Sequence, residues 1–230
     1  MDKQTIREAV WDALEESGEA RFPFPPHNRI PNFNGADEAA KRLAETDAWR
    51  EADTLKANPD APQLPVRRAA LRAGKTVYMA VPRLREEKPF LELDPAEIED
   101  IDAATTVSGS AEHGVPVDPE EMPAVDLIVS GSVAADDAGH RIGKGEGYSD
   151  LEFAVLSAFG LVDDVTVATT VHEIQRKEGL PTDAHDVPLD LVVTPERTVE
   201  TGGGERPEGI RWDELSEEKV SEIPVLERLR

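Results

Sequence analysis

A glycine-rich stretch beyond the middle of the chain has the residue types of an anion-binding loop. Glycines alternate at Gly143, Gly145 and Gly147, and the basic residues Arg141 and Lys144 stand among them. Glycine lets the backbone turn tightly and bring its N–H groups close to an anion, and the start of a following helix adds partial positive charge. The stretch therefore predicts a phosphate-binding loop. A turn with a purely structural role is the alternative.

The spacing of these glycines differs from the two common nucleotide-binding fingerprints. A Walker A loop ends in Gly-Lys followed by Ser or Thr, whereas here Gly145 follows Lys144. The Rossmann fingerprint G-x-G-x-x-G also differs from the strictly alternating pattern of this chain. The loop thus predicts phosphate binding without assigning either of these two motifs.

Several other chemistries are excluded or disfavoured by the residues present. The chain has no Cys, which excludes disulfides, thiolate metal sites and Cys nucleophiles. Its 5 His residues show no His-x-His or His-Glu-x-x-His spacing, which argues against a zinc site. A Gly-x-Ser-x-Gly nucleophile elbow is also absent.

Continuous apolar runs that alternate with helical patterns must position this loop. We expect strands at 52–57, 75–81, 125–129, 165–171 and 189–193, and helices at 4–16, 36–49, 66–73, 95–104 and 149–159. Such alternation is typical of a mostly parallel sheet covered by helices on both faces. The sequence predicts an α/β fold of three layers (αβα) with a mostly parallel, Rossmann-like sheet.

Other segments carry more local expectations. Four prolines interrupt residues 21–35, which we expect to form an ordered arm that packs against the body. Arg67, Arg68 and Arg72 are interpreted as a solvated helix face. We expect one domain over residues 1–200, followed by a loosely ordered C-terminal extension over 201–230.

The composition bears on partners and environment. Among 230 residues, 48 are Asp or Glu and 25 are Lys or Arg, so the formal net charge is −23. This charge argues against binding nucleic acid or an anionic membrane. Apolar runs are too short to span a bilayer and no secretory signal is present, which predicts a cytoplasmic protein. An acidic, Lys-poor surface favours a halophile's cytoplasm, because screening over about 3 Å at ~1 M salt weakens self-repulsion; an acidic functional surface is the alternative.

Three stretches together carry a resemblance to a known family. Residues 126–134 and 139–150 resemble the signature of the 5-formyltetrahydrofolate cyclo-ligases (5,10-methenyltetrahydrofolate synthetases). Residues 3–7 resemble the N-terminal Lys-x-x-Leu-Arg of that family, and residues 167–194 resemble its closing strand–loop–strand. The similarity covers nearly the whole chain in the same order. It implies the three-layer architecture of NagB, RpiA and the CoA-transferases.

The resemblance also implies a reaction and roles for particular residues. The family uses ATP and Mg²⁺ to close 5-formyltetrahydrofolate to 5,10-methenyltetrahydrofolate, so the partners would be a reduced folate and ATP. Lys3 and Arg7 would reach the triphosphate; Arg141, Gly143, Gly145 and Gly147 would wrap the phosphates; Asp150 would hold Mg²⁺. Lys144 is a further phosphate-binding candidate from its charge, and Tyr148 is expected either to contact a ligand or to pack internally. Lys3 and Arg7 could instead pair with neighbouring acids, and Asp150 could simply favour the helix start.

The chain departs from the family pattern at the end of the loop. The family has Gly-Tyr-Tyr-Asp-Arg, whereas here Ser149 and Leu151 replace the second Tyr and the Arg. Glu146 stands where a small residue is usual, and Asp60 is the nearest candidate for a substrate-side Glu of the family. The arm over residues 20–35 and this version of the loop over residues 141–152 resemble the divergent methenyltetrahydrofolate-synthetase-domain-containing branch. They leave a second hypothesis open, a nucleotide-binding paralogue without cyclo-ligase activity that serves thiamine or other cofactor metabolism. Fold analogy alone adds a sugar-phosphate isomerase or acyl-transfer activity.

Overall fold

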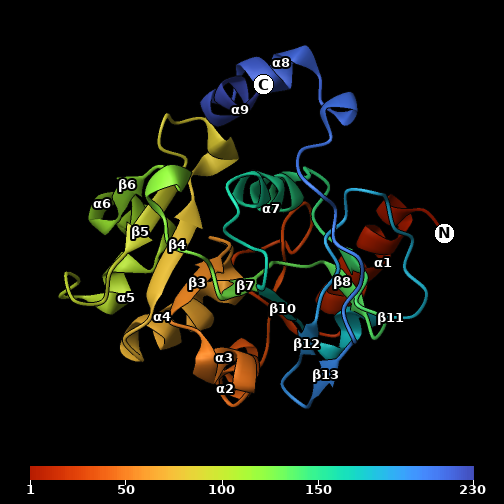
Figure 1. The fold of residues 1–230 in the computed structure, drawn as a ribbon. Helices are drawn as coiled ribbons and strands as arrows, with labels where there is room; N and C mark the ends of the chain where they lie inside the picture. The colour runs from red at the N-terminus through yellow and green to blue at the C-terminus, as the bar shows by residue number, and fades with distance from the viewer.

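A computed structural model describes residues 1–230 and places an eight-stranded sheet at the centre of the molecule (Figure 1). The strand order is β13-β12-β10-β7-β3-β4-β5-β6. Five central strands are parallel: β3 (Thr54–Ala57), β4 (Thr76–Ala80), β7 (Leu127–Val129), β10 (Thr166–Thr170) and β12 (Leu191–Val193). Antiparallel strands complete both edges: β5 (Phe90–Leu93), β6 (Val115–Val117) and β13 (Thr198–Glu200). The mostly parallel sheet of the sequence prediction is confirmed.

Helices cover both faces of this sheet. In Figure 1, α7 (Tyr148–Ala158) lies above it, and α2 (Ala36–Ala44), α3 (Asp47–Glu51) and α4 (Leu64–Arg72) lie below. The side chains of the strands alternate accordingly: Leu127 and Val129 pack with the lower helices, whereas Ile128 belongs to the core under α7. Both faces are therefore apolar, which explains the continuous apolar runs in the sequence and confirms the three-layer prediction.

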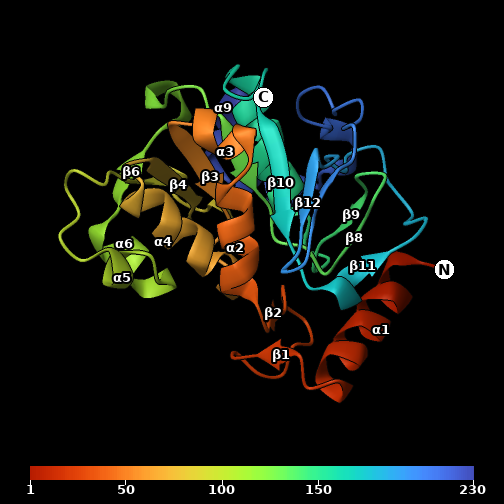
Figure 2. The ribbon, with the colours of Figure 1, turned by 90° about the horizontal axis from the view of Figure 1, so that it is seen from below.

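The N-terminal region forms a third packed unit beside the sheet (Figure 2). Helix α1 (Lys3–Glu16) begins at Asp2, whose side chain accepts a hydrogen bond from the Thr5 amide, and buries Ile6, Val10, Trp11 and Leu14. It packs near the hairpin β1 (Ala20–Arg21) and β2 (Asn32–Phe33), and near the small sheet β11 (Arg176–Lys177), β8 (Ala134–Asp136) and β9 (Arg141–Ile142).

The arm over residues 21–35 packs only in part. Ile30 and Phe33 are buried as expected, but Phe22 and Phe24 are 78% and 60% exposed. The predicted arm therefore packs against the body through Ile30 and Phe33, whereas Phe22 and Phe24 face solvent.

Two predicted helices differ in the structure, and two strands are present that were not predicted. The helix expected over 36–49 is broken, because Thr46 accepts a hydrogen bond from the Trp49 amide and starts α3 anew. The helix expected over 95–104 shrinks to α5 (Ile101–Ala104), and α6 (Val107–His113) follows it. Strands β5 and β6 were not expected; β6 contains Pro116, which an edge strand tolerates because one side of its backbone needs no partner.

The C-terminal segment differs from the expectation of loose order. It ends in α8 (Glu217–Ser221), capped by Ser216, and α9 (Pro224–Leu229). Their apolar side chains Val220, Ile223, Val225 and Leu226 are buried in the same core as α7. Through these apolar residues, the segment 216–229 packs against the rest of the molecule, although the surrounding sequence is charged. None of the helices in the molecule combines the length and apolar character that a membrane span requires.

Candidate functional site

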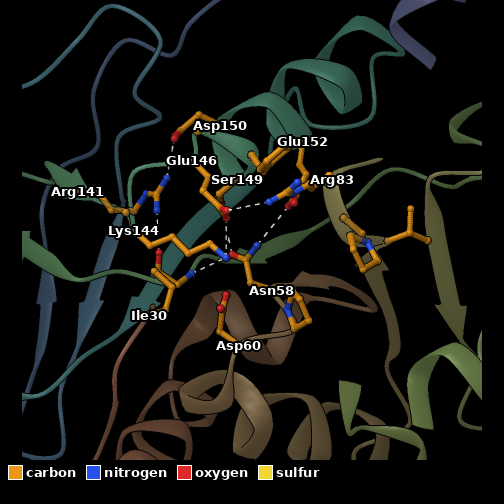
Figure 3. A pocket seen from close by; sticks show the side chains of 18 residues that line it. Ile30, Asn58, Asp60, Arg83, Arg141, Lys144, Glu146, Ser149, Asp150 and Glu152 are labelled. Atoms are coloured by element: carbon orange, nitrogen blue, oxygen red, sulfur yellow. Dashed lines mark hydrogen bonds and ion pairs between the residues drawn. The ribbon is translucent and has the colours of Figure 1, made fainter. Parts of the chain in front are cut away.

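A cavity of about 350 Å³ opens at the carboxyl ends of β3, β4 and β7. The chain runs from β3 to β4 on one side and then returns to place β7 on the other side of β3. Such a switch point in an open α/β sheet is a common ligand-binding place, because the loops on either side turn apart. The polar residues that line the cavity come from four segments: Asn58, Asp60, Arg83, Arg141, Lys144, Glu146, Ser149, Asp150 and Glu152 (Figure 3).

The predicted glycine loop forms one wall of this cavity. Strand β9 ends at Ile142 and α7 begins at Tyr148, so residues 143–147 connect them, and all but Gly145 line the cavity. Gly145 and Gly147 have φ values of 107° and 71°, a backbone region that other residues rarely adopt. A Cβ atom on Gly145 would also lie 3.3 Å from Arg7 Cζ. The alternating glycines therefore allow both the turn and the close approach of a neighbouring side chain.

Arg141 and Asp150 form a buried ion pair that joins the two ends of the loop. Arg141 Nη2 lies 2.9 Å from both carboxylate oxygens of Asp150, and Arg141 Nη1 donates to the Gly131 carbonyl at 2.8 Å. The Val187 amide also donates to Asp150 Oδ1. Burial opposes ionisation of Asp150, but the Arg141 charge and these hydrogen bonds hold its pKa below the usual value. Both residues line the cavity with their charged atoms already engaged.

Lys144, Glu146 and Arg83 form a second and more exposed cluster. Lys144 Nζ lies 2.8 Å from Glu146 Oε2, and Arg83 Nη2 lies 3.8 Å from Glu146 Oε1. Figure 3 shows Lys144 and Arg83 approaching Glu146 from different sides. Burial opposes the charge of Lys144, but its hydrogen bond with Glu146 and the charge of Asp60 raise its pKa. These three charged groups are exposed and can contact a ligand, whereas the Arg141–Asp150 pair is buried and already engaged.

Asp60 brings a carboxylate into the cavity without a cation of its own. No Lys, Arg or His nitrogen lies within 4.0 Å of its oxygens. Loss of hydration raises the pKa of Asp60, and the charge of Lys144 opposes that shift. Among the acids that line the cavity, Asp60 is thus the one best placed to meet a cationic group.

Arg67 holds the segment that carries Asp60. Its Nη1 donates to the carbonyls of Asn58 at 2.6 Å and Asp60 at 3.0 Å, and its Nε donates to the Thr105 carbonyl at 3.0 Å. Burial lowers the pKa of Arg67 to about 10. The interpretation of Arg67 as a solvated residue is wrong, because its position on α4 turns it under the loop, whereas Arg72 remains exposed.

Sequence reasoning missed a buried ion pair between Lys56 and Glu152. Lys56 lies on β3 under α7, and its side chain is 1% exposed. Its ammonium bonds to Glu152 Oε2, which Asn58 Nδ2 also approaches at 3.3 Å. The signal was present, because a Lys inside an apolar strand that is covered on both faces requires an internal partner.

Lys3 and Arg7 lie outside the cavity. Lys3 Nζ lies 2.8 Å from Asp183 and 2.5 Å from Asp186, in the segment between β11 and β12. Arg7 Nε donates to the Gly143 carbonyl at 2.7 Å, on the outer side of the loop. Neither residue lines the cavity, and neither pairs with the acids of its own helix. Arg7 therefore supports the glycine loop from its outer side, whereas Lys3 lies away from the cavity.

The acids that bind Lys3 belong to a cluster of residues of the types that can ligate a metal ion. Asp183, His185 and Asp186 place one ligand atom each within 4.8 Å of one another. Lys3 Nζ already bonds to both carboxylates, so a metal ion at this group would have to displace it.

Tyr148 lies where the cavity meets a second opening. A groove of about 340 Å³ shares Arg83, Glu146 and Tyr148 with the cavity, and residues 216–222 line its other side. Lys219 Nζ lies 4.8 Å from the centroid of the Tyr148 ring, so one face of the ring is covered by α8. The cavity and the groove therefore form two connected compartments.

Comparison with known proteins agrees with this architecture. The model of the 5-formyltetrahydrofolate cyclo-ligase family matches residues 1–195. The chain is 42% identical to a mouse methenyltetrahydrofolate synthase domain-containing protein, over 100% of this chain and 63% of that protein. For the human protein of the same description the identity is 37%, over 100% of this chain and 62% of that protein. The chain thus spans a little under two thirds of these relatives.

A solved structure shares the fold. The NMR structure of Aquifex aeolicus 5,10-methenyltetrahydrofolate synthetase superimposes with a TM-score of 0.57 at 20% identity, covering 92% of this chain and 99% of that chain. The fold, the motif order and the family model agree: the chain belongs to the 5-formyltetrahydrofolate cyclo-ligase family.

Proposed function

We propose that the protein uses ATP to close 5-formyltetrahydrofolate to 5,10-methenyltetrahydrofolate, releasing ADP and phosphate. The observation that carries this proposal is the glycine loop, which lines a cavity at the switch point of the sheet in a member of the cyclo-ligase family. The divergent relatives carry only a domain name, so the reaction itself is the proposal.

The residues around the loop fit a phosphate chain. Gly143 and Gly147 leave the backbone open to the cavity, and Lys144 and Arg83 bring two cations to it. Phosphoryl transfer depends mainly on positioning and on neutralising charge at the phosphate oxygens. We assign these two functions to the loop backbone and to Lys144. Arg141 positions the loop through Asp150 rather than contacting the phosphates directly.

The residues fit Mg²⁺ at a different carboxylate from the predicted one. Mg²⁺ neutralises the phosphates of ATP and prefers oxygen ligands. Both oxygens of Asp150 are bonded to Arg141, so Asp150 would have to leave that pair in order to bind a metal ion. Asp60 lines the same cavity without such a partner and is the residue that we propose to hold Mg²⁺.

The inner cavity also has a surface that suits the second substrate. Ile30, Ala80, Val81 and Tyr148 give the inner cavity apolar surface, on which we place the reduced folate ring. The formyl oxygen would accept the γ-phosphoryl group, N10 of the folate would then attack the activated carbon, and phosphate would leave. The residues of the cavity orient the two substrates so that these atoms meet.

A direct assay tests the proposal. Purified protein in high salt is mixed with MgATP and 5-formyltetrahydrofolate, and the absorbance of the methenyl product is followed, with a reaction lacking ATP as the control. ATP-dependent product is the expected result. Absence of product together with retained ATP binding would instead favour the nucleotide-binding paralogue in thiamine or other cofactor metabolism.

The cellular setting belongs to this proposal as well. The net charge of −23 and the small number of Lys residues support the proposal that the protein works in a cytoplasm of high salt concentration, because salt weakens the repulsion among surface carboxylates.

A further inference from the structure

Glu146 is a carboxylate placed inside its own anion-binding loop. It lies between Lys144 at 2.8 Å and Arg83 at 3.8 Å. These two cations come from different segments, Lys144 from the glycine loop and Arg83 from the connection between β4 and β5. The carboxylate thus balances two charges that would otherwise face each other across the opening of the cavity (Figure 3).

The backbone around Arg83 is built to present this side chain. Arg83 and Leu84 have φ values of 58° and 55°, and two successive residues other than glycine in this region are unusual. Leu84 is fully buried and anchors the turn in the core, whereas the Arg83 side chain is 53% exposed and directed toward Glu146. Arg83 makes no other ion pair within 4.0 Å. The turn therefore serves to bring one cation to the cavity.

The position of Glu146 allows it to move. Its side chain is 40% exposed, and it lines both the inner cavity and the outer groove next to α8. A rotation toward the groove would keep the carboxylate in contact with water while it left Lys144 and Arg83. An incoming anion could then take its place without leaving any charge buried and unpaired.

We propose that Glu146 is an internal substitute for a ligand's phosphate, and that Arg83 and Lys144 bind the phosphate once Glu146 has swung into the groove. Arg83 is then a phosphate-binding residue that the sequence did not indicate, and Glu146 sets the affinity of the site. This inference rests on the proposed function only in that the phosphate belongs to a nucleotide chain.

The test measures binding of inorganic tripolyphosphate by titration calorimetry at one fixed salt concentration. We expect Glu146→Gln to tighten binding about tenfold, because the competing carboxylate is removed, and Arg83→Gln to weaken it about tenfold. The double variant should bind more tightly than Arg83→Gln and more weakly than Glu146→Gln, because Lys144 is freed from Glu146 but Arg83 is absent. Glu38→Gln on α2 controls for net charge, and Arg85→Gln, whose side chain pairs with Glu222, controls for the loss of a nearby Arg. Thermal unfolding checks that every variant is folded.

Each outcome decides the proposal. Unchanged or weaker binding by Glu146→Gln would overturn it, and so would the absence of tripolyphosphate binding in all variants. If the protein forms no methenyl product but binds tripolyphosphate more tightly after Glu146→Gln, the ring-closing function fails and this site stands. If the protein forms the product but its tripolyphosphate binding is indifferent to Glu146 and Arg83, the ring-closing function stands and this site fails.

Discussion

Two sets of ion pairs surround the same cavity, and they differ in how much water reaches them. In the inner set, the side chains of Lys56 and Glu152 are 1% and 8% exposed, and those of Arg141 and Asp150 are 5% and 12% exposed. In the outer set, Lys144, Glu146 and Arg83 are between 37% and 53% exposed. Both sets place basic residues in or beside the cavity that we propose as the phosphate site, but only the outer set can exchange its partner for a ligand at low cost. Charge near a site therefore does not by itself distinguish residues that build the site from residues that bind.

The largest expected effect comes from removing one member of the inner set, which tests whether these ion pairs stabilise the fold. Lys56→Met should lower the free energy of unfolding by about 3–5 kcal/mol, because it leaves Glu152 buried without its cation. Denaturant titration in high salt measures this loss. The double variant Lys56→Met with Glu152→Leu should recover most of the loss, and equal stability of the two variants would show that the pair is not a unit.

Asp150→Asn should have the next largest effect on stability. At neutral pH we expect a loss of about 3 kcal/mol, because Arg141 remains buried without a counter-charge. The pKa of Asp150 is lowered in the folded state, so its contribution is complete above the unfolded pKa of about 3.9 and is lost as the pH falls through the lower folded value. The stability difference between the two proteins, measured by denaturant titration between pH 7 and pH 3, should therefore be constant down to about pH 5 and shrink below about pH 4. A difference that grew on acidification would contradict the assignment.

A smaller effect separates the outer set from the inner one. Lys144→Ala should weaken ATP binding about tenfold, or ~1.4 kcal/mol, and change the free energy of unfolding by less than ~0.5 kcal/mol. Arg141→Ala should weaken ATP binding and also destabilise the protein, because Asp150 then loses its partner. Calorimetry with ATP and thermal unfolding on the same samples make the distinction. If the two variants behaved alike in both measurements, the division into two sets would have no meaning.

The sequence was sufficient for the central sheet and the loop. Long apolar runs separated by helical patterns predict parallel strands, and the alternating glycines predict a tight turn before α7, because both signals are local. The edge strands β5 and β6 gave weaker signals, since they are short and β6 contains a proline.

The partners of the charged residues could not be predicted in the same way. Arg67 and Arg72 lie on the same helix, and only the packing of the β3–α4 connection makes Arg67 internal. Arg141 and Asp150 resembled a phosphate ligand and a metal ligand, and their pairing depends on how the loop folds back. Lys3 was expected at a phosphate and instead joins Asp183 and Asp186, which are distant in the chain. The sequence signal for Lys56 was missed: a Lys inside a covered strand requires a buried acid, although the sequence does not identify Glu152 as that acid.

The C-terminal helices extend the site beyond the part of the chain that the family model describes. That match ends at residue 195, yet Ser216, Glu218, Lys219 and Glu222 line the outer groove and Lys219 covers Tyr148. A fragment that ended at residue 195 would keep the glycine loop but lose the side of the outer groove that Ser216, Glu218, Lys219 and Glu222 form. The shape of the groove beside the glycine loop therefore depends on the C-terminal tail as well as on the loop itself.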